Sequence, residues 1–404
     1  MTTLARTFST LRLRDFRLYW LALVVSLLGS SFQMAAQDWL VYRLTNSALL
    51  LGIAAFVPAV LAAPFSLVGG ALADRMPRRR LILLTQVGMM VPPLALAWLI
   101  ATGQVQVWHV IASSVVLGVL VSIDAPARMA LLNDLVSEDD LGNAMGLSTA
   151  VYQGARVVGP ALAGVLIGLQ NEALPFLING LSYGAMVVAL LLMHTRAVPA
   201  ARSRKSLGGS VVEGYRYVLK DAVLFGLMAL LFAQGMLLMP YLRLMPVFAR
   251  DVLQAGPETY GLLLSAAGIG ALFGGLLVAS MSSGRRGRVL MLGTLLAPFV
   301  LLAFAWSRAL PLAIGTLVLM GIGTALLNTL NATLLQLHAP NEMRGRVMSI
   351  ASIGYLGSTS FGALPLSFIA ERSSASIALS AGAVLFLVVT VLIAVRYSAV
   401  RRLA

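Results

Sequence analysis

Cysteine is absent from this chain of 404 residues, and charge is scarce, with 15 acidic residues, 29 lysines and arginines and 3 histidines. Without cysteine the chain forms no disulfide and offers no thiolate ligand to a metal. Charged residues make up 11% of the sequence, whereas soluble proteins carry about 25%. The shortage of charge therefore excludes an ordinary soluble domain.

Enzyme and cofactor signatures are also missing. The three histidines, at positions 109, 194 and 338, are far apart in the sequence and form no metal-binding pattern. No Gly-x-x-x-x-Gly-Lys-Ser/Thr phosphate-binding loop occurs anywhere. We therefore expect no enzyme, no cofactor and no metal, and any transport would use an ion gradient rather than a nucleotide.

Long apolar runs are what the sequence does contain. Hydrophobic residues make up 59% of the chain, and runs of about 20 apolar residues, the length of a membrane-spanning helix, recur throughout. The runs are continuous rather than alternating, which excludes a transmembrane β-barrel. We predict an all-α membrane protein with twelve transmembrane helices in two six-helix bundles. The predicted spans are residues 18–42, 48–72, 81–101, 108–131, 145–169, 174–194, 223–248, 259–282, 288–307, 310–336, 347–370 and 376–396.

The net charge of +14 is explained by membrane topology. Of the 29 lysines and arginines, 23 fall in or beside the connections on one side of the predicted spans, Arg128 among them. Cytoplasmic loops carry such an excess, so both termini are predicted to lie in the cytoplasm, with the chain in a bacterial cell (inner) membrane. Nucleic-acid binding is not needed to explain the charge. The opposite side holds only Arg43, Arg250, Arg308 and Arg372.

A polar connection at residues 196–221 divides the chain into a bundle at 1–195 and a bundle at 222–404. Residues 211–219 within it are predicted to form a short amphipathic helix at the membrane surface. A plain linker is the alternative.

The two halves resemble diverged repeats. The segments before the fifth and eleventh spans both place an acidic turn, then a glycine and a methionine, ahead of a span rich in glycine. In that register Gly154 aligns with Gly357. Gly159 likewise aligns with Gly362. Parallel repeats of this kind indicate a central cavity between two bundles and transport by alternating access.

The stretch GALADRMPRR, residues 70–79, resembles the loop between spans 2 and 3 of the major facilitator superfamily, with Pro77 where a second glycine is usual. The resemblance covers the full chain. It implies that Asp74 caps the amino end of a helix in the opposite half and holds the cytoplasmic side closed. Asp134, at the end of span 4, would face the arginines. The predicted cytoplasmic gate comprises Gly70, Asp74, Arg75, Arg78, Arg79 and Asp134.

A second resemblance concerns the fifth span. GARVVGPALAG, residues 154–164, is similar to the glycine-rich antiporter motif of the superfamily, through Gly154, Gly159, Pro160 and Gly164. Glycines allow helices to approach closely and Pro160 kinks the span, so ordinary helix packing is the alternative. Several further stretches resemble the branch that holds macrolide-efflux proteins and the enterobactin exporter. The span-4 arginine of many drug–proton antiporters would fall near Ser114 and is absent.

Ionisable residues inside a membrane are costly and suggest function. Four lie within the predicted spans: Asp38, Asp124, Arg156 and Arg243. Asp124 is the acid nearest in depth to Arg156, and a static structural pair is the alternative to a functional one. Asp38 and Arg243 could instead reach the interface, near Arg43 and Asp251 respectively. An arginine favours an ionised carboxylate, whereas burial favours the protonated form, so an Asp124 held by Arg156 would leave Asp38 as the better proton carrier.

Polar residues inside spans are candidates for substrate contact, although each could simply form a hydrogen bond between helices. They are Gln33, Gln37, Tyr152, Gln234, Asn328, Asn331 and Tyr355. The resemblance implies a secondary active exporter of amphipathic small molecules, drug-like compounds or siderophores, coupled to protons through rocker-switch alternating access. We expect a monomer whose partners are the substrate, protons and the lipid bilayer. A lysophospholipid or other lipid flippase and a non-transporting membrane sensor remain alternatives.

Overall fold

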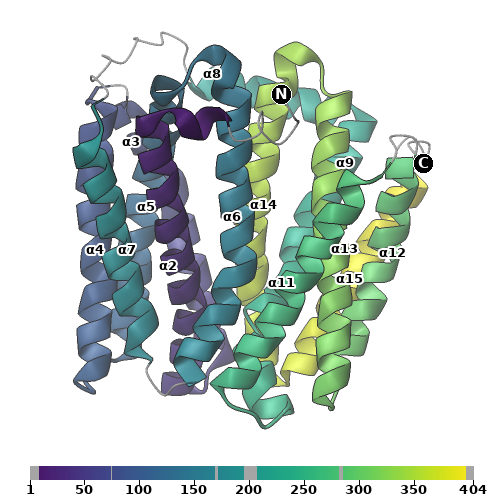
Figure 1. Cartoon of the computed structure of the whole chain (residues 1–404). Helices are drawn as coiled ribbons and strands as arrows, with labels where there is room; N and C mark the ends of the chain where they lie inside the picture. The colour runs from purple at the N-terminus through teal and green to yellow at the C-terminus, as the bar shows by residue number, and fades with distance from the viewer. Residues whose placement is uncertain (1–8, 74, 169–171, 195–206, 282–284, 397–404) are drawn as a thin grey trace. The chain divides into compact units, whose positions relative to one another are not determined.

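The computed structural model describes residues 9–73, 75–168, 172–194, 207–281 and 285–396, and within these ranges it contains helices and no strand (Figure 1). This confirms the all-α prediction. The longer helices are α2 Arg14–Thr45, α3 Ala48–Ala73, α4 Arg78–Ala101, α5 Val107–Leu135, α6 Glu138–Gly168, α7 Ala173–Leu192, α8 Leu207–Lys220, α9 Ala222–Ala233, α11 Pro257–Ala279, α12 Arg286–Ala305, α13 Leu310–His338, α14 Asn341–Arg372 and α15 Ala375–Arg396. The short elements are η1 Ser9–Arg12, η2 Gln234–Leu238, η3 Met239–Leu242, α10 Met245–Val247 and η4 Phe248–Val252.

Among the described residues, 11 helical segments are long and apolar enough to cross a membrane. Every predicted span coincides with a helical segment, but α6, with 31 residues, is not among these 11. The chain is therefore a multi-pass membrane protein, while a count of twelve spans in two six-helix bundles stays a prediction.

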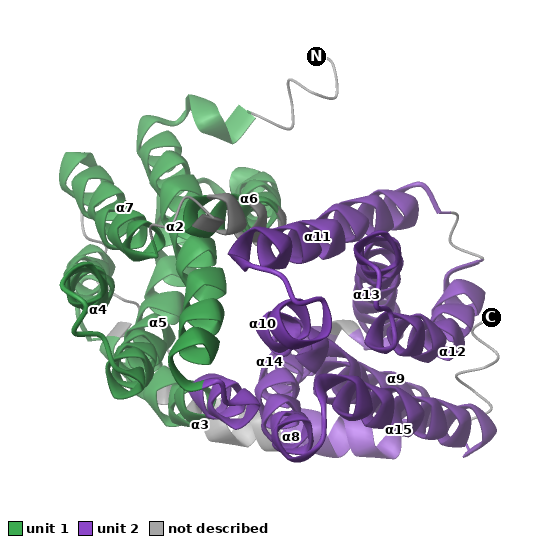
Figure 2. Cartoon of the chain, turned by 90° about the horizontal axis from the view of Figure 1, so that it is seen from below, with its two compact units in different colours: residues 1–45, 57–203 green, residues 46–56, 204–404 purple. Residues whose placement is uncertain are grey.

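The chain divides into two compact units, residues 1–45 with 57–203, and residues 46–56 with 204–404 (Figure 2). In the first unit α2 packs against α6 and α7, and α4 packs against α5 and α7. In the second, η2 packs against α14 and α15, and α12 packs against α13 and α15. Corresponding helices thus have corresponding neighbours, as diverged repeats require.

Helix α3 is divided between the units, which a boundary at residue 195 does not anticipate. Residues 46–56, which include the start of α3, belong with the second unit, where the Phe56 and Phe361 rings meet edge to face with centroids 5.0 Å apart. Glu371 accepts a hydrogen bond from the Leu49 N–H at 3.2 Å. The division falls next to Pro58, and a proline inside a helix weakens its hydrogen bonding.

The seventh predicted span is irregular. Residues 222–252 run as α9, the π-helix η2, the 3₁₀ turn η3, α10 and the π-helix η4. Pro240 and Pro246 lack the N–H that a regular helix needs. Short π-helical segments are frequent at functional sites, so this segment is a candidate for substrate contact.

Candidate transport site

Three residues of the predicted cytoplasmic gate, Arg78, Arg79 and Asp134, make contacts around the start of α4. Arg78, the first residue of α4, donates from Nη1 to Asp134 Oδ1 at 2.5 Å and to the Ala130 carbonyl at 3.1 Å, and both charged side chains are mostly buried. Arg79 donates to the Leu191 carbonyl at the end of α7, at 3.1 Å. A cation at a helix N-terminus is unfavourable, and the Asp134 carboxylate offsets it. The structure therefore brings α4, α5 and α7 together at this end of the first unit.

The rest of the gate is less complete. Asp74 lies outside the described residues, and the Arg75 side chain is exposed. Of the adjacent glycines, Gly69 is the one in close contact, because a Cβ there would lie 2.6 Å from Ile123 Cα. Gly70, in contrast, faces open space. Close helix packing at this site thus depends on Gly69, and Gly70 does not contribute to it.

Asp124 lies in a buried polar cluster between α4 and α5. Its Oδ1 accepts hydrogen bonds from Thr85 Oγ1 at 2.6 Å and from Gln86 Nε2 at 3.2 Å. Its Oδ2 accepts from Nε of Arg128, and the pair has side-chain exposures of 5% and 10%. Tyr19 of α2 is a further electrostatic neighbour of Arg128. The carboxylate thus has a hydrogen-bond donor on each oxygen and an adjacent cation.

This cluster pairs Asp124 with a cation that the sequence analysis did not name for it. That cation is Arg128, four residues further along α5, while the side chain of Arg156, the expected partner, lies outside the described residues. Arg128, which the predicted topology counts beside the connections of one side, is only 9% exposed in this cluster. Positions four apart meet on one helix face, so the spacing of Asp124 and Arg128 was the available signal.

Two further predicted residues lie on α2. Gln33 is buried and accepts a hydrogen bond from Asn179 Nδ2 of α7 at 2.6 Å, which favours the helix-packing alternative. Asp38 is also buried, at 7% exposure. Arg43, proposed as a neighbour for Asp38, forms an ion pair with Glu172 at 2.7 Å.

In the second unit, two candidates for substrate contact bind backbone carbonyls instead. Gln234 Nε2 donates to Thr324 O at 3.2 Å, and Asn331 Nδ2 donates to Leu227 O at 3.0 Å. Asn331 Oδ1 is buried without a partner, so half of that amide is available to a donor. The remaining substrate-contact candidates are half-buried or exposed and lie on α2, α6, α13 and α14. They are Gln37, Tyr152, Asn328 and Tyr355. Arg243, predicted as a charge within a span, is half-buried and follows η3.

Some glycines of the glycine-rich helix α6 contact a neighbouring helix, and others face open space. A Cβ on Gly159 would overlap Ser31 of α2, whereas one on Gly154 would meet nothing within 4 Å. The same contrast holds for the aligned positions, since Gly362 is pressed against the Met236 carbonyl and Gly357 is open. The surroundings of Pro160 and Gly164 lie outside the described side chains. No group of metal-binding residues occurs in the part of the chain that the structure describes.

The fold is that of a major facilitator transporter. A bacterial homologue of the human lysosomal transporter Spinster has a TM-score of 0.72 over 100% of this chain and 98% of its own, at 13% identity. Over residues 5–402 the sequence matches the transmembrane secretion effector family, and the chain belongs to that family.

Three curated relatives match over most of their length. The staphyloferrin A transporter of Staphylococcus aureus is 24% identical over 80% of this chain and 81% of the relative. The multidrug efflux pump Tap of Mycolicibacterium fortuitum is 26% identical over 84% of each. The enterobactin exporter EntS of Shigella boydii is 25% identical over 82% of this chain and 79% of the relative. The resemblance predicted from the sequence is confirmed.

Proposed function

We propose that this protein is a secondary active exporter of amphipathic small molecules, either siderophores or drug-like compounds. The observation that carries the proposal is the match, over about four-fifths of the chain, to relatives named as an enterobactin exporter and a multidrug efflux pump. The glycine-rich motif of α6 also supports transport out of the cell, because the motif that it resembles accompanies efflux in the superfamily. The protein acts as a monomer in a bacterial inner membrane with both termini in the cytoplasm.

Transport proceeds by rocker-switch alternating access between two halves. Asp74 closes the cytoplasmic side in the outward-open state by capping a helix of the opposite half. The Arg78–Asp134 ion pair supports this role, because it fixes the adjacent start of α4 against α5. A carboxylate at a helix N-terminus contributes up to about 2 kcal/mol, which suits a gate that must reopen.

Protons drive the export, and Asp38 is the acid that takes them up. Asp124 is already bound by Thr85, Gln86 and Arg128, and protonation would leave that arginine without its counter-charge in a buried site. Asp38 is the other buried carboxylate among the described spans. The Asp124 cluster therefore acts as a fixed tie between α4 and α5.

Everted membrane vesicles test the proposal. Vesicles that contain the protein should accumulate at least one compound from a panel of siderophores and amphipathic drugs when a proton gradient is imposed, and a protonophore should abolish the uptake. Accumulation without dependence on the gradient would contradict proton coupling. If none of the panel accumulates but a labelled lysophospholipid changes leaflet, the flippase alternative replaces the exporter.

A further inference from the structure

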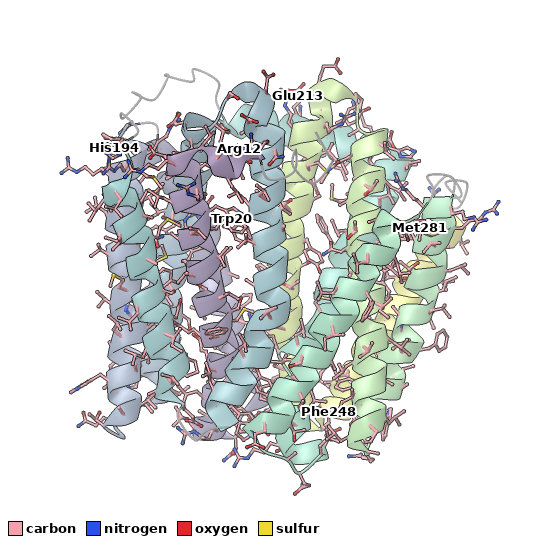
Figure 3. All side chains as sticks on the ribbon, viewed as in Figure 1. Arg12, Trp20, His194, Glu213, Phe248 and Met281 are labelled. Carbon is pink, nitrogen blue, oxygen red and sulfur yellow. The ribbon has the colours of Figure 1, made fainter. Side chains whose placement is uncertain are left out.

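The amphipathic helix predicted at residues 211–219 is present as α8, Leu207–Lys220. A single residue, Asp221, separates α8 from α9. The Asp221 carboxylate accepts hydrogen bonds from the N–H groups of Val223 at 2.9 Å and Leu224 at 3.0 Å, at the start of α9. Because residue 222 opens a candidate membrane span, this cap fixes the end of α8 at the membrane boundary. Glu213 lies at the end of the unit opposite Phe248 (Figure 3).

One side of α8 is seated on α14. A Cβ on Gly214 would lie 3.0 Å from Arg346 Cβ and 3.1 Å from Ile350 Cδ1, so the two helices are in close contact there. Val218, one turn later, is 4% exposed. Glu213 adds an ion pair with Arg346 at 2.7 Å. The orientation of α8 about its own axis is therefore fixed by α14.

The remaining surface of α8 separates apolar from basic side chains. Successive positions are about 100° apart around a helix, and positions four apart share a face. Gly214 and Val218 face α14, and the next pair around the helix is Tyr215 and Leu219, which are 55% and 50% exposed. The pair after that is Arg216 with Lys220, and both are exposed. An apolar stripe thus lies beside a basic stripe on the side turned away from the protein.

We propose that this surface binds an anionic phospholipid of the cytoplasmic leaflet. Arg216 and Lys220 bind the headgroup phosphate, while Tyr215 and Leu219 contact the glycerol region and the upper acyl chain. Basic residues next to a membrane span attract anionic lipids, and tyrosine prefers the interface. The side of the chain that carries this surface is the one with the predicted excess of lysine and arginine.

Lipid binding here would stabilise the start of α14. A headgroup that holds Arg216 keeps α8 on the membrane, and the Glu213–Arg346 ion pair transmits that restraint to α14. The site requires only that α8 lies at the membrane surface, so it stands or falls independently of which compound is exported.

Lipid retention by the purified full-length protein tests the proposal. The probe is dioleoyl phosphatidylglycerol, with dioleoyl phosphatidylcholine for comparison, and native mass spectrometry measures the bound lipid. R216Q/K220Q should weaken phosphatidylglycerol binding by about thirtyfold, because each basic residue at an anionic surface contributes about a factor of five. The matched control R308Q/R372Q removes two exposed cations from connections predicted to lie on the other side, and should bind as the parent does.

Two further measurements sharpen the result. Y215S/L219S should also lose phosphatidylglycerol, and soluble glycerol phosphate should fail to compete with the lipid for the parent protein. Equal lipid binding by R216Q/K220Q and the parent would overturn the proposal. Competition by glycerol phosphate as effective as that by the lipid would overturn it too, because the site would then recognise a free phosphate rather than a membrane lipid.

Discussion

At the residue scale, the Asp124–Arg128 pair is the feature with the clearest energetic consequence. Burial of two charges is costly, and the pair persists because each Asp124 oxygen has a donor. Tyr19 of α2 is a further electrostatic neighbour of both charges. Replacement of one residue leaves the other charge buried and unpaired, whereas replacement of both leaves no unpaired charge.

We therefore predict strong coupling between the two positions. Asp124→Leu and Arg128→Leu should each destabilise the protein by about 3–5 kcal/mol, and the double variant should cost much less than the sum of the two. Thermal unfolding in detergent, read as a double-mutant cycle, measures this. Additive effects would mean that the two charges do not depend on each other.

Asp38 gives a second prediction at this scale. Asp38→Asn keeps the size of the side chain but cannot carry a proton, so proton-driven transport should be lost while substrate binding remains. Glu172→Gln is the matched control, since it neutralises an acid that pairs with Arg43 rather than one buried within α2. Undiminished uphill transport by Asp38→Asn would remove Asp38 from the mechanism.

At the scale of the element, some glycines of α6 and α14 contact a neighbouring helix and others do not. At the two aligned positions, Gly159 and Gly362 contact the first span of their half, whereas Gly154 and Gly357 face open space. Helix contact without a Cβ is a common basis for association in membranes.

Gly159→Ala and Gly362→Ala should each destabilise the protein by about 1–3 kcal/mol, the usual cost of overpacking. Gly154→Ala and Gly357→Ala are the matched controls and should be tolerated, since nothing lies within 4 Å of either added Cβ. The loss of thermal stability relative to the parent checks this. Equal stability in all four variants would contradict the close helix contacts.

At the scale of the whole molecule, the placement of charge gives the topology. Reporter fusions after His194 and after Arg402 should both report a cytoplasmic location, because the connections on that side hold most of the lysine and arginine. A fusion after Arg308 should report the periplasm and serves as the control. A periplasmic signal at either of the first two sites would contradict a chain with both ends inside.

Asp74 of the predicted cytoplasmic gate gives the second prediction at this scale. Asp74→Asn removes the charge that favours the facing helix terminus, so the outward-open state should lose about 1–2 kcal/mol. That is a shift of about five- to thirtyfold toward the inward-open state. Since the chain has no native cysteine, a single cysteine on the cytoplasmic side of the cavity should label faster in Asp74→Asn. Equal labelling rates would make Asp74 an ordinary membrane-edge charge.

The sequence by itself determined the helical class, the approximate position of each long helix, and the family. These follow from local properties, because apolar runs, charge placement and turn motifs are read along the chain. The contact between Arg78 and Asp134 was also predicted, since the resemblance implies that the acid at the end of span 4 faces the arginines of the 70–79 loop.

The tertiary structure decided most other contacts between side chains. It paired Arg128 with Asp124, bound Arg43 to Glu172, placed Gly69 in close contact while Gly70 faces open space, and divided α3 beside Pro58. The physical reason is that membrane helices are apolar on every side. Their sequence therefore gives little indication of rotation about the helix axis, which is set by packing against neighbours.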